Sequence, residues 1–201
     1  MKKIAVFLFF LLSLNIFLRG DFKIMGGFNL SRYHTTPEEN LSWEPLWGLA
    51  GGFGLEKGLT DFTLLEFNFM FIQKGTSLKV TGASNSSAKY RLNTLSVPVL
   101  LRQKFLYSSG PYVTAGLELS SILSHKVKWK RSEKPLDLKD HTRLFDYGLI
   151  VGIGWEFKLE EHLFFFSEIR YHQGWRNIFK ELEKGNTRKT NSLLLIIGMR
   201  S

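Results

Sequence analysis

The feature that most constrains the fold is the alternation of side-chain types from Phe145 to Lys158, FDYGLIVGIGWEFK. Odd-numbered positions in this segment carry bulky apolar side chains. Even-numbered positions carry glycine or charged residues, with Ile150 as the exception. Strict alternation over this length predicts a β-strand with two unlike faces. The remaining question is which of the two faces points into the protein.

In a water-soluble sheet the bulky face forms the core, and the reverse face carries polar residues for solvent. Here the reverse face is largely glycine, which weakens a strand unless neighbouring groups crowd it. A narrow closed barrel supplies that crowding if the small and polar face points inward and the bulky face points outward. Only a lipid environment tolerates a bulky apolar exterior. The segment therefore predicts a strand of a barrel embedded in a membrane.

The same alternation recurs along most of the chain, in eight candidate strands. They span residues 22–33, 46–57, 65–71, 90–105, 111–124, 145–158, 163–174 and 192–200. The connections between them alternate between long (34–45, 76–89, 125–144, 175–191) and short (GLTD, LYSSG, LEEH). This regular alternation is typical of outer-membrane barrels. We therefore predict an all-β fold, an eight-stranded antiparallel up-and-down transmembrane β-barrel, with both termini in the periplasm.

The N-terminus reads MKKIAVFLFFLLSLNIFLRG, with two lysines before a mainly apolar run. The run is short for a membrane-spanning helix and suits a secretory signal peptide, with an uncleaved anchor as the alternative. We therefore divide the chain into a signal peptide, 1–20, and a barrel domain, 21–201. The net charge of +9 favours anionic surroundings such as lipid headgroups or lipopolysaccharide. Because no basic stripe with interleaved aromatic residues follows a strand or helix, nucleic acid is not an expected partner.

The faces predicted to point inward carry charges of both signs. An eight-stranded barrel is just wide enough for its own side chains to fill, and buried charges must be paired or solvated. We therefore expect a charge network in the lumen, with a narrow water path or a ligand-binding lumen as the alternatives. Its predicted members are Glu66, Arg102, Glu118, Glu156, Glu168, Arg170 and His172.

The third long connection contains the basic run HKVKWKRSEKPLDLKDH. Clustered Lys and Arg side chains attract phosphate groups. The run is therefore a candidate for contact with anionic lipopolysaccharide headgroups or with an acidic partner, and a solvated loop tip is the alternative. The residues proposed for this contact are Lys126, Lys128, Lys130 and Arg131.

Catalytic chemistry is not expected. Some outer-membrane barrels modify lipids with a Ser/His pair, but Ser167 and His172 fall on opposite faces of a regular strand. His34, His125, His141 and His162 are predicted to lie in loops or turns, without the spacing of metal ligands. The sequence therefore predicts a protein that is not an enzyme and that holds no metal or cofactor.

Several strand patterns are similar to those of a known family. The segments are FTLLEFNFMFIQKG, YRLNTLSVPVLLRQKF, GPYVTAGLELSSIL, FDYGLIVGIGWEF and FFFSEIRYHQGWRNI. In order and spacing they resemble the PorT-like family of outer-membrane β-barrel domains. The resemblance implies an eight-stranded barrel in the outer membrane. Most members of the family have no assigned role, and its name-giving branch is tied to protein secretion.

The leading functional hypothesis is an integral barrel of the bacterial outer membrane with a filled polar lumen and a structural, adhesive or secretion-accessory role. Its expected partners are outer-membrane lipids, lipopolysaccharide and other envelope or secretion proteins. One alternative is a small outer-membrane pore. Another is a soluble, secreted, lipocalin-like calyx that binds a lipophilic ligand. The calyx would turn Phe67 and Phe69 inward and leave the glycines facing water.

Overall fold

The computed structural model describes residues 20–35, 41–80, 87–107, 109–130, 132, 134–180 and 187–201. The predicted signal segment lies outside this part of the chain, apart from Gly20. The strands are β1 (Asp21–Thr35), β2 (Leu41–Gly58), β3 (Thr63–Val80), β4 (Ser87–Lys104), β5 (Gly110–Trp129), β6 (Leu136–Asp137), β7 (Phe145–Lys158), β8 (Phe164–Gly174) and β9 (Arg188–Arg200). A short 3₁₀ helix, η1, spans Lys139–His141. Among the described residues, no helix has the length and apolar character needed to cross a bilayer.

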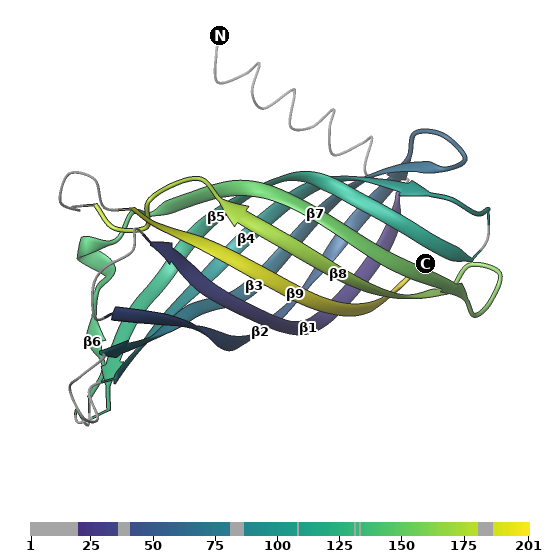
Figure 1. The fold of residues 1–201 in the computed structure, drawn as a ribbon. Coiled ribbons are helices and arrows are strands. Elements are labelled where there is room, and N and C mark those ends of the chain that lie inside the picture. The colour runs from purple at the N-terminus through teal and green to yellow at the C-terminus, as the bar shows by residue number, and fades with distance from the viewer. Residues whose placement is uncertain are drawn as a thin grey trace, which may run out of the picture.

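The long strands form one closed antiparallel barrel. Each pairs with its neighbour in the order β4-β3-β2-β1-β9-β8-β7-β5, and β4 also pairs with β5 and closes the ring (Figure 1). The two-residue β6 lies outside the ring and pairs only with β5. The predicted eight-stranded antiparallel barrel is therefore confirmed. Below, the end that carries the tight connections 59–62, 105–109 and 159–163 is called the turn end, and the opposite end is called the loop end.

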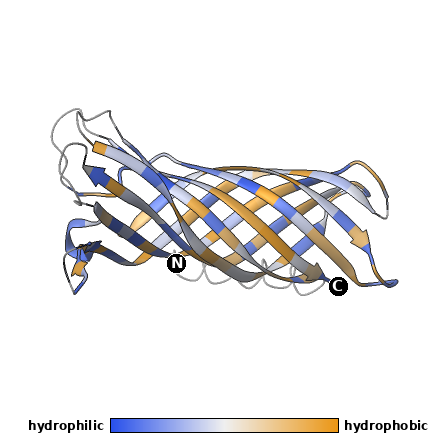
Figure 2. Ribbon diagram, turned by 60° about the horizontal axis from the view of Figure 1, so that its bottom comes forward, coloured by the Kyte–Doolittle hydropathy of each residue, from blue (hydrophilic) through white to orange (hydrophobic). Residues whose placement is uncertain are grey.

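Bulky apolar side chains point outward from the barrel wall. On β7 and β2, for example, Leu149 is 37% exposed and Trp47 is 64% exposed, whereas Glu118 on β5 is 2% exposed. Orange and blue residues alternate along the strands when the ribbon is coloured by hydropathy (Figure 2). This arrangement is opposite to the one that a soluble calyx requires.

The glycines of β7 lie where the lumen is crowded. A Cβ atom added at Gly152 would lie 2.9 Å from Glu168 Oε1, and one added at Gly154 would overlap the ring of Tyr112. Real Cβ atoms essentially never approach other atoms so closely. The glycine-rich face predicted to point inward therefore makes room for side chains from across the barrel.

The strands extend further at the loop end than the sequence analysis predicts. β2 begins at Leu41, β3 ends at Val80 and β5 ends at Trp129, so much of the predicted loops 34–45, 76–89 and 125–144 is β-ladder. His125, expected in a loop, is a fully buried residue of β5. Beyond the apolar band the outward face becomes mostly polar, whereas the inward face carries a buried apolar cluster of Leu78, Ala88 and Val127. Backbone pairing therefore continues where the apolar-out, polar-in alternation no longer holds.

One part of the wall is irregular at the loop end. The β1–β2 ladder stops at the Ser31–Leu46 pair, while β1 continues to pair with β9 as far as Thr35. The register of β2 with β3 shifts between Pro45 and Ala50. The Ser31 side chain links β1 to β3 across this gap, because its hydroxyl accepts from Gly75 N at 2.6 Å and lies 3.0 Å from Gly75 O.

Candidate functional sites in the lumen and at the loop end

All seven residues predicted for the lumen charge network lie on inward faces of the strands and are at most 2% exposed. Arg102 on β4 is at the centre of the cluster near the turn end. Its guanidinium lies 2.5 Å from Glu66 Oε1, 3.2 Å from Glu156 Oε2 and 3.3 Å from Glu56 Oε1. Lys23 Nζ, from β1, contacts two of the same carboxylates: Glu56 on β2 at 2.9 Å and Glu66 on β3 at 2.5 Å. These contacts join β1, β2, β3, β4 and β7 across the lumen.

Glu168 and Arg170 on β8 pair directly with each other. Arg170 donates from Nε to Glu168 Oε1 and from Nη2 to Glu168 Oε2, both at 2.8 Å. This two-point contact is the strong form of an arginine–carboxylate pair. Arg170 Nη2 also lies 3.5 Å from Glu66 Oε2, which links this pair to the cluster around Arg102.

A second centre lies nearer the loop end. Lys74 on β3 donates to Glu118 Oε1 at 2.8 Å, and Ser120 donates to the same oxygen at 2.6 Å. His172 Nε2 lies 3.6 Å from Glu118 Oε1, which is beyond hydrogen-bond range. Neither ring nitrogen of His172 hydrogen-bonds within the described part of the chain. His172 therefore lies beside the network without forming a hydrogen bond to it.

Four further buried charged residues belong to the network and were not predicted from the sequence: Lys23, Glu56, Lys74 and Arg200. Arg200 donates to Glu156 Oε2 from Nε at 2.7 Å. Lys23 and Glu56 already had the inward parity of their strands, so parity could have identified them. Lys74 also has the parity of Glu66, but the predicted strand ended before it.

The completed network contains equal numbers of buried acidic and basic groups. The carboxylates are those of Glu56, Glu66, Glu118, Glu156 and Glu168, and the cations are those of Lys23, Lys74, Arg102, Arg170 and Arg200. Each member has at least one opposite charge within 4 Å. Chemically, the arrangement fills the lumen with ion pairs.

Aromatic side chains fill the loop-end mouth above this network. His125 Nε2 lies 3.0 Å from the Tyr33 hydroxyl, and His125 Nδ1 lies 2.7 Å from Thr142 Oγ1. The ring of Phe179, from the segment after β8, lies 5.2 Å from the ring of His125. Trp43 packs beside Tyr33 at 6.1 Å between ring centroids. Several chain segments therefore meet in the mouth and cover the lumen.

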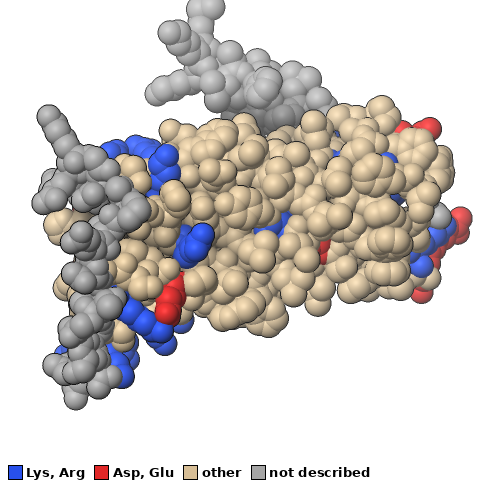
Figure 3. Space-filling model, in the orientation of Figure 1, with Lys and Arg blue, Asp and Glu red and all other residues tan. Residues whose placement is uncertain are grey.

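The basic run lies partly on strand β5. Lys126 and Lys128 are exposed residues of β5, Lys130 follows the strand, and Arg131 lies outside the described residues. In register, Lys126 is opposite Arg91 and Lys128 is opposite Lys89, so two cations of β4 join the run. Figure 3 shows blue side chains gathered at the loop end and most of the visible red ones at the turn end. Sequence patterns alone do not predict that the lysines of β5 stand opposite cations of β4.

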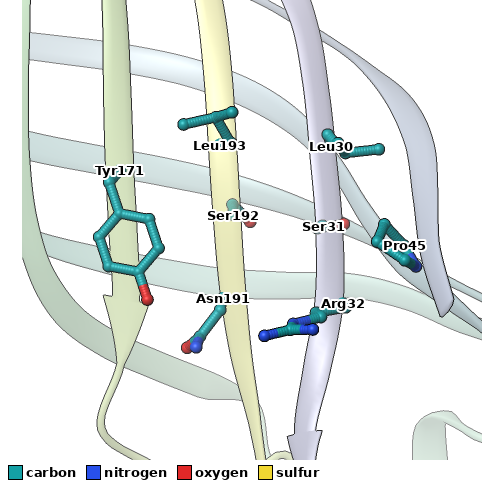
Figure 4. Close-up of a pocket in the computed structure, with 8 residues that line it drawn as sticks. All are labelled: Leu30, Ser31, Arg32, Pro45, Tyr171, Asn191, Ser192 and Leu193. Carbon is teal, nitrogen blue, oxygen red and sulfur yellow. The ribbon is translucent and has the colours of Figure 1, made fainter. Parts of the chain in front are cut away.

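A shallow groove crosses the outside of the wall where β2 leaves β1 (Figure 4). Leu30 and Leu193 lie at one end of it, and Arg32 and Asn191 at the other, with Pro45 and Tyr171 on its two sides. Its surface is almost entirely apolar. The irregular pairing of β2 therefore leaves a local depression in the outer wall.

The described residues show no catalytic arrangement of the kinds considered. Ser167 lies on the outward face of β8 and His172 on the inward face, as predicted, so the two do not form a pair. No group of three His, Asp or Glu side chains within the described ranges is placed to hold a metal ion.

Comparisons with known proteins agree with this architecture. The profile of the family described as "Outer membrane protein beta-barrel domain" matches residues 18–180. A search of curated proteins gave no match. The fold is similar to that of the outer membrane protein OprG from Pseudomonas aeruginosa, with a TM-score of 0.55, 16% identity and coverage of 90% of this chain and 94% of that one. Neisserial surface protein A is also similar, with a TM-score of 0.47, 14% identity and coverage of 90% and 98%.

Proposed function

Since this chain belongs to the outer membrane protein β-barrel domain family, we propose that it is a barrel of the bacterial outer membrane whose filled lumen does not conduct ions. Its role would be structural or adhesive, with the barrel as a rigid support for the surface at its loop end. The single observation that carries this proposal is the double closure of the lumen. Ion pairs fill the barrel around Arg102, and aromatic side chains around His125 fill the mouth.

Conductance in planar bilayers tests the closed lumen. We expect the folded wild-type protein to give no steady single-channel current, because the charges that could line a water path are paired with one another. Heat-modifiable gel mobility of the same sample shows that the inserted protein is a folded barrel. Steady channels from such a sample would refute the proposal and favour the small pore.

We also propose that the loop end faces the exterior and that both termini lie in the periplasm, after removal of the signal peptide 1–20. The short connections at one end and the longer ones at the other support this orientation. The chain has no cysteine, so single cysteines can be introduced cleanly. In intact cells, a membrane-impermeant maleimide should label K134C at the loop end and should not label E160C at the turn end. The reverse labelling would invert the orientation.

The finer assignment to the PorT-like branch, and a secretion-accessory role with it, is supported by the strand patterns alone. Deletion of the gene followed by measurement of secreted protein tests that role. Unchanged secretion in the deletion strain would favour the structural or adhesive role.

A further inference from the structure

Two pairs of like charges face each other across the β4–β5 ladder at the loop end. Lys89 is directly opposite Lys128, and Arg91 is directly opposite Lys126. All four side chains are exposed on the outward face. We call these four residues the cation ladder. Like charges placed directly opposite each other on antiparallel strands are destabilising, so the fold alone does not account for the ladder.

Described acidic residues compensate little of this charge. None of the four cations forms an ion pair with a described acidic side chain. Asp137 on β6 is opposite Lys126 on the other side of β5 and offsets part of the charge there, and its carboxylate also accepts from the backbone N–H of Lys139 at 2.8 Å. The ladder is therefore a concentration of positive charge for which an external anion is the natural counterpart.

The height of the ladder above the membrane narrows the choice of anion. Leu123 is the last exposed apolar side chain of β5 before the ladder, and Lys126 and Lys128 follow it in the strand. At ~3.3 Å per residue and a tilt near 40°, the two pairs lie about 8 and about 13 Å beyond Leu123 along the membrane normal. The polar zone of a phospholipid leaflet is only about 5–8 Å thick. The Arg91–Lys126 pair therefore lies at the outer edge of the phospholipid headgroups, and the Lys89–Lys128 pair reaches past them, to the level of the sugars of lipopolysaccharide.

A hollow of about 450 Å³ continues the ladder away from the membrane. It is lined by Lys89, Lys128, Trp129, Lys130 and Ser87. Trp129 is 42% exposed there and offers a flat apolar ring among the cations. An indole face suits the apolar face of a sugar ring, while the lysines at its sides suit phosphate. The lining therefore matches a phosphorylated sugar better than a bare phosphate ion.

We propose that the cation ladder and the Trp129 hollow bind a phosphorylated sugar of the lipopolysaccharide core in the same outer leaflet. Such a ligand would place phosphate oxygens between the opposed cations and relieve their repulsion. This inference depends on the proposed location in the outer membrane with the loop end outside, but not on whether the lumen conducts.

The test measures binding to purified, detergent-folded protein by calorimetry. The probe is the soluble phosphorylated core oligosaccharide released from lipopolysaccharide by mild acid, and its dephosphorylated form is the comparison. K89Q/K128Q removes one opposed pair. K134Q/K139Q removes the same charge from exposed lysines at the same end but outside the ladder. We expect K89Q/K128Q to weaken binding at least about tenfold, the loss typical of one charge-assisted contact.

We further expect dephosphorylation to weaken wild-type binding by a similar factor, and W129A to weaken it as well. The matched control K134Q/K139Q should change affinity less than about twofold, because neither lysine belongs to the ladder or lines the hollow, and an exposed charge without a direct contact contributes little. Equal losses in the two double variants would show an effect of net charge only and would overturn the proposal. Tighter binding of a sulfated glycan oligosaccharide than of the phosphorylated core would overturn it in favour of an external polyanion.

Stability without ligand gives a second, independent readout. Because K89Q/K128Q removes a repulsion, its ligand-free barrel should melt at a higher temperature than the wild type, and saturating phosphorylated core should remove that difference. A ligand-free melting temperature that is unchanged or lower would show that the opposed lysines do not repel, which would overturn the premise.

Discussion

The Lys74–Glu118 pair permits a quantitative test of how the lumen charges stabilise the barrel. Among the described residues, Glu118 is the one acidic side chain within 4 Å of Lys74 Nζ, and both side chains are at most 1% exposed. Removing one member of a buried ion pair typically costs about 3–5 kcal/mol, because the other charge is left uncompensated. We therefore expect K74M and E118Q each to lower the free energy of unfolding by about that amount.

The double variant K74M/E118Q separates this cost from the net value of the pair. With both charges gone, the amide oxygen introduced at position 118 would still accept from the Ser120 hydroxyl, which donates to Glu118 at 2.6 Å in the wild type. Replacing a whole buried pair by uncharged groups is often close to neutral. We therefore expect the double variant to lie within about 2 kcal/mol of the wild type, far from the sum of the two single losses.

Urea unfolding in lipid vesicles, followed by tryptophan fluorescence and gel mobility, measures all four proteins. Two results would refute the reasoning. Single variants with wild-type stability would mean that the pair is solvated and not buried in the folded barrel. A double variant as unstable as the sum of the singles would mean that the two side chains do not act on each other.

Two further predictions concern the two faces of the wall. G154V should prevent barrel folding or strongly weaken it, because the added side chain would overlap the Tyr112 ring. G26A should be tolerated, because its Cβ would meet only Ala50 O at 3.9 Å. Heat-modifiable gel mobility measures the folding of both variants, and a normally folded G154V would disprove the crowding. L117R should cost about 2–4 kcal/mol if Leu117, 56% exposed, faces lipid. L59R, in a turn, should cost little, and equal stability of the two variants in urea unfolding would contradict a lipid-facing position for Leu117.

Alternation was sufficient to predict the barrel and the side of the wall on which most charges lie. Side-chain parity repeats every two residues, so one well-placed strand fixes the direction of every residue in it. This is why Glu66, Glu118 and Glu168 could be assigned inward from sequence. Arg200 was missed because β9 has apolar residues on both faces, with Leu194 buried inside and Leu195 exposed outside, so its parity is not visible in the sequence.

Which residues stand opposite each other could not be predicted. Inter-strand register depends on how far each strand is displaced along its neighbour when the barrel closes. The opposition of Arg91 and Lys126 also depends on a register shift between Asn93 and Thr94 that no local pattern announces. The extension of the strands at the loop end was not predicted for a related reason. The β-ladder at His125 is held by backbone pairing and by aromatic packing from distant segments, such as Phe179.

The parting of β1 from β2 has a mechanical consequence. Among the described strands, β1 beyond Ser31 has a hydrogen-bonded neighbour on one edge only, as does β2 before Leu46. Strand ends with a hydrogen-bonded neighbour on one edge only open more readily than the body of the barrel, where strands are paired on both edges. The Ser31 hydroxyl bridges β1 and β3 there. Amide exchange in β1 should accordingly start beyond Ser31, at Arg32, and spread toward the turn end, and S31A should hasten it.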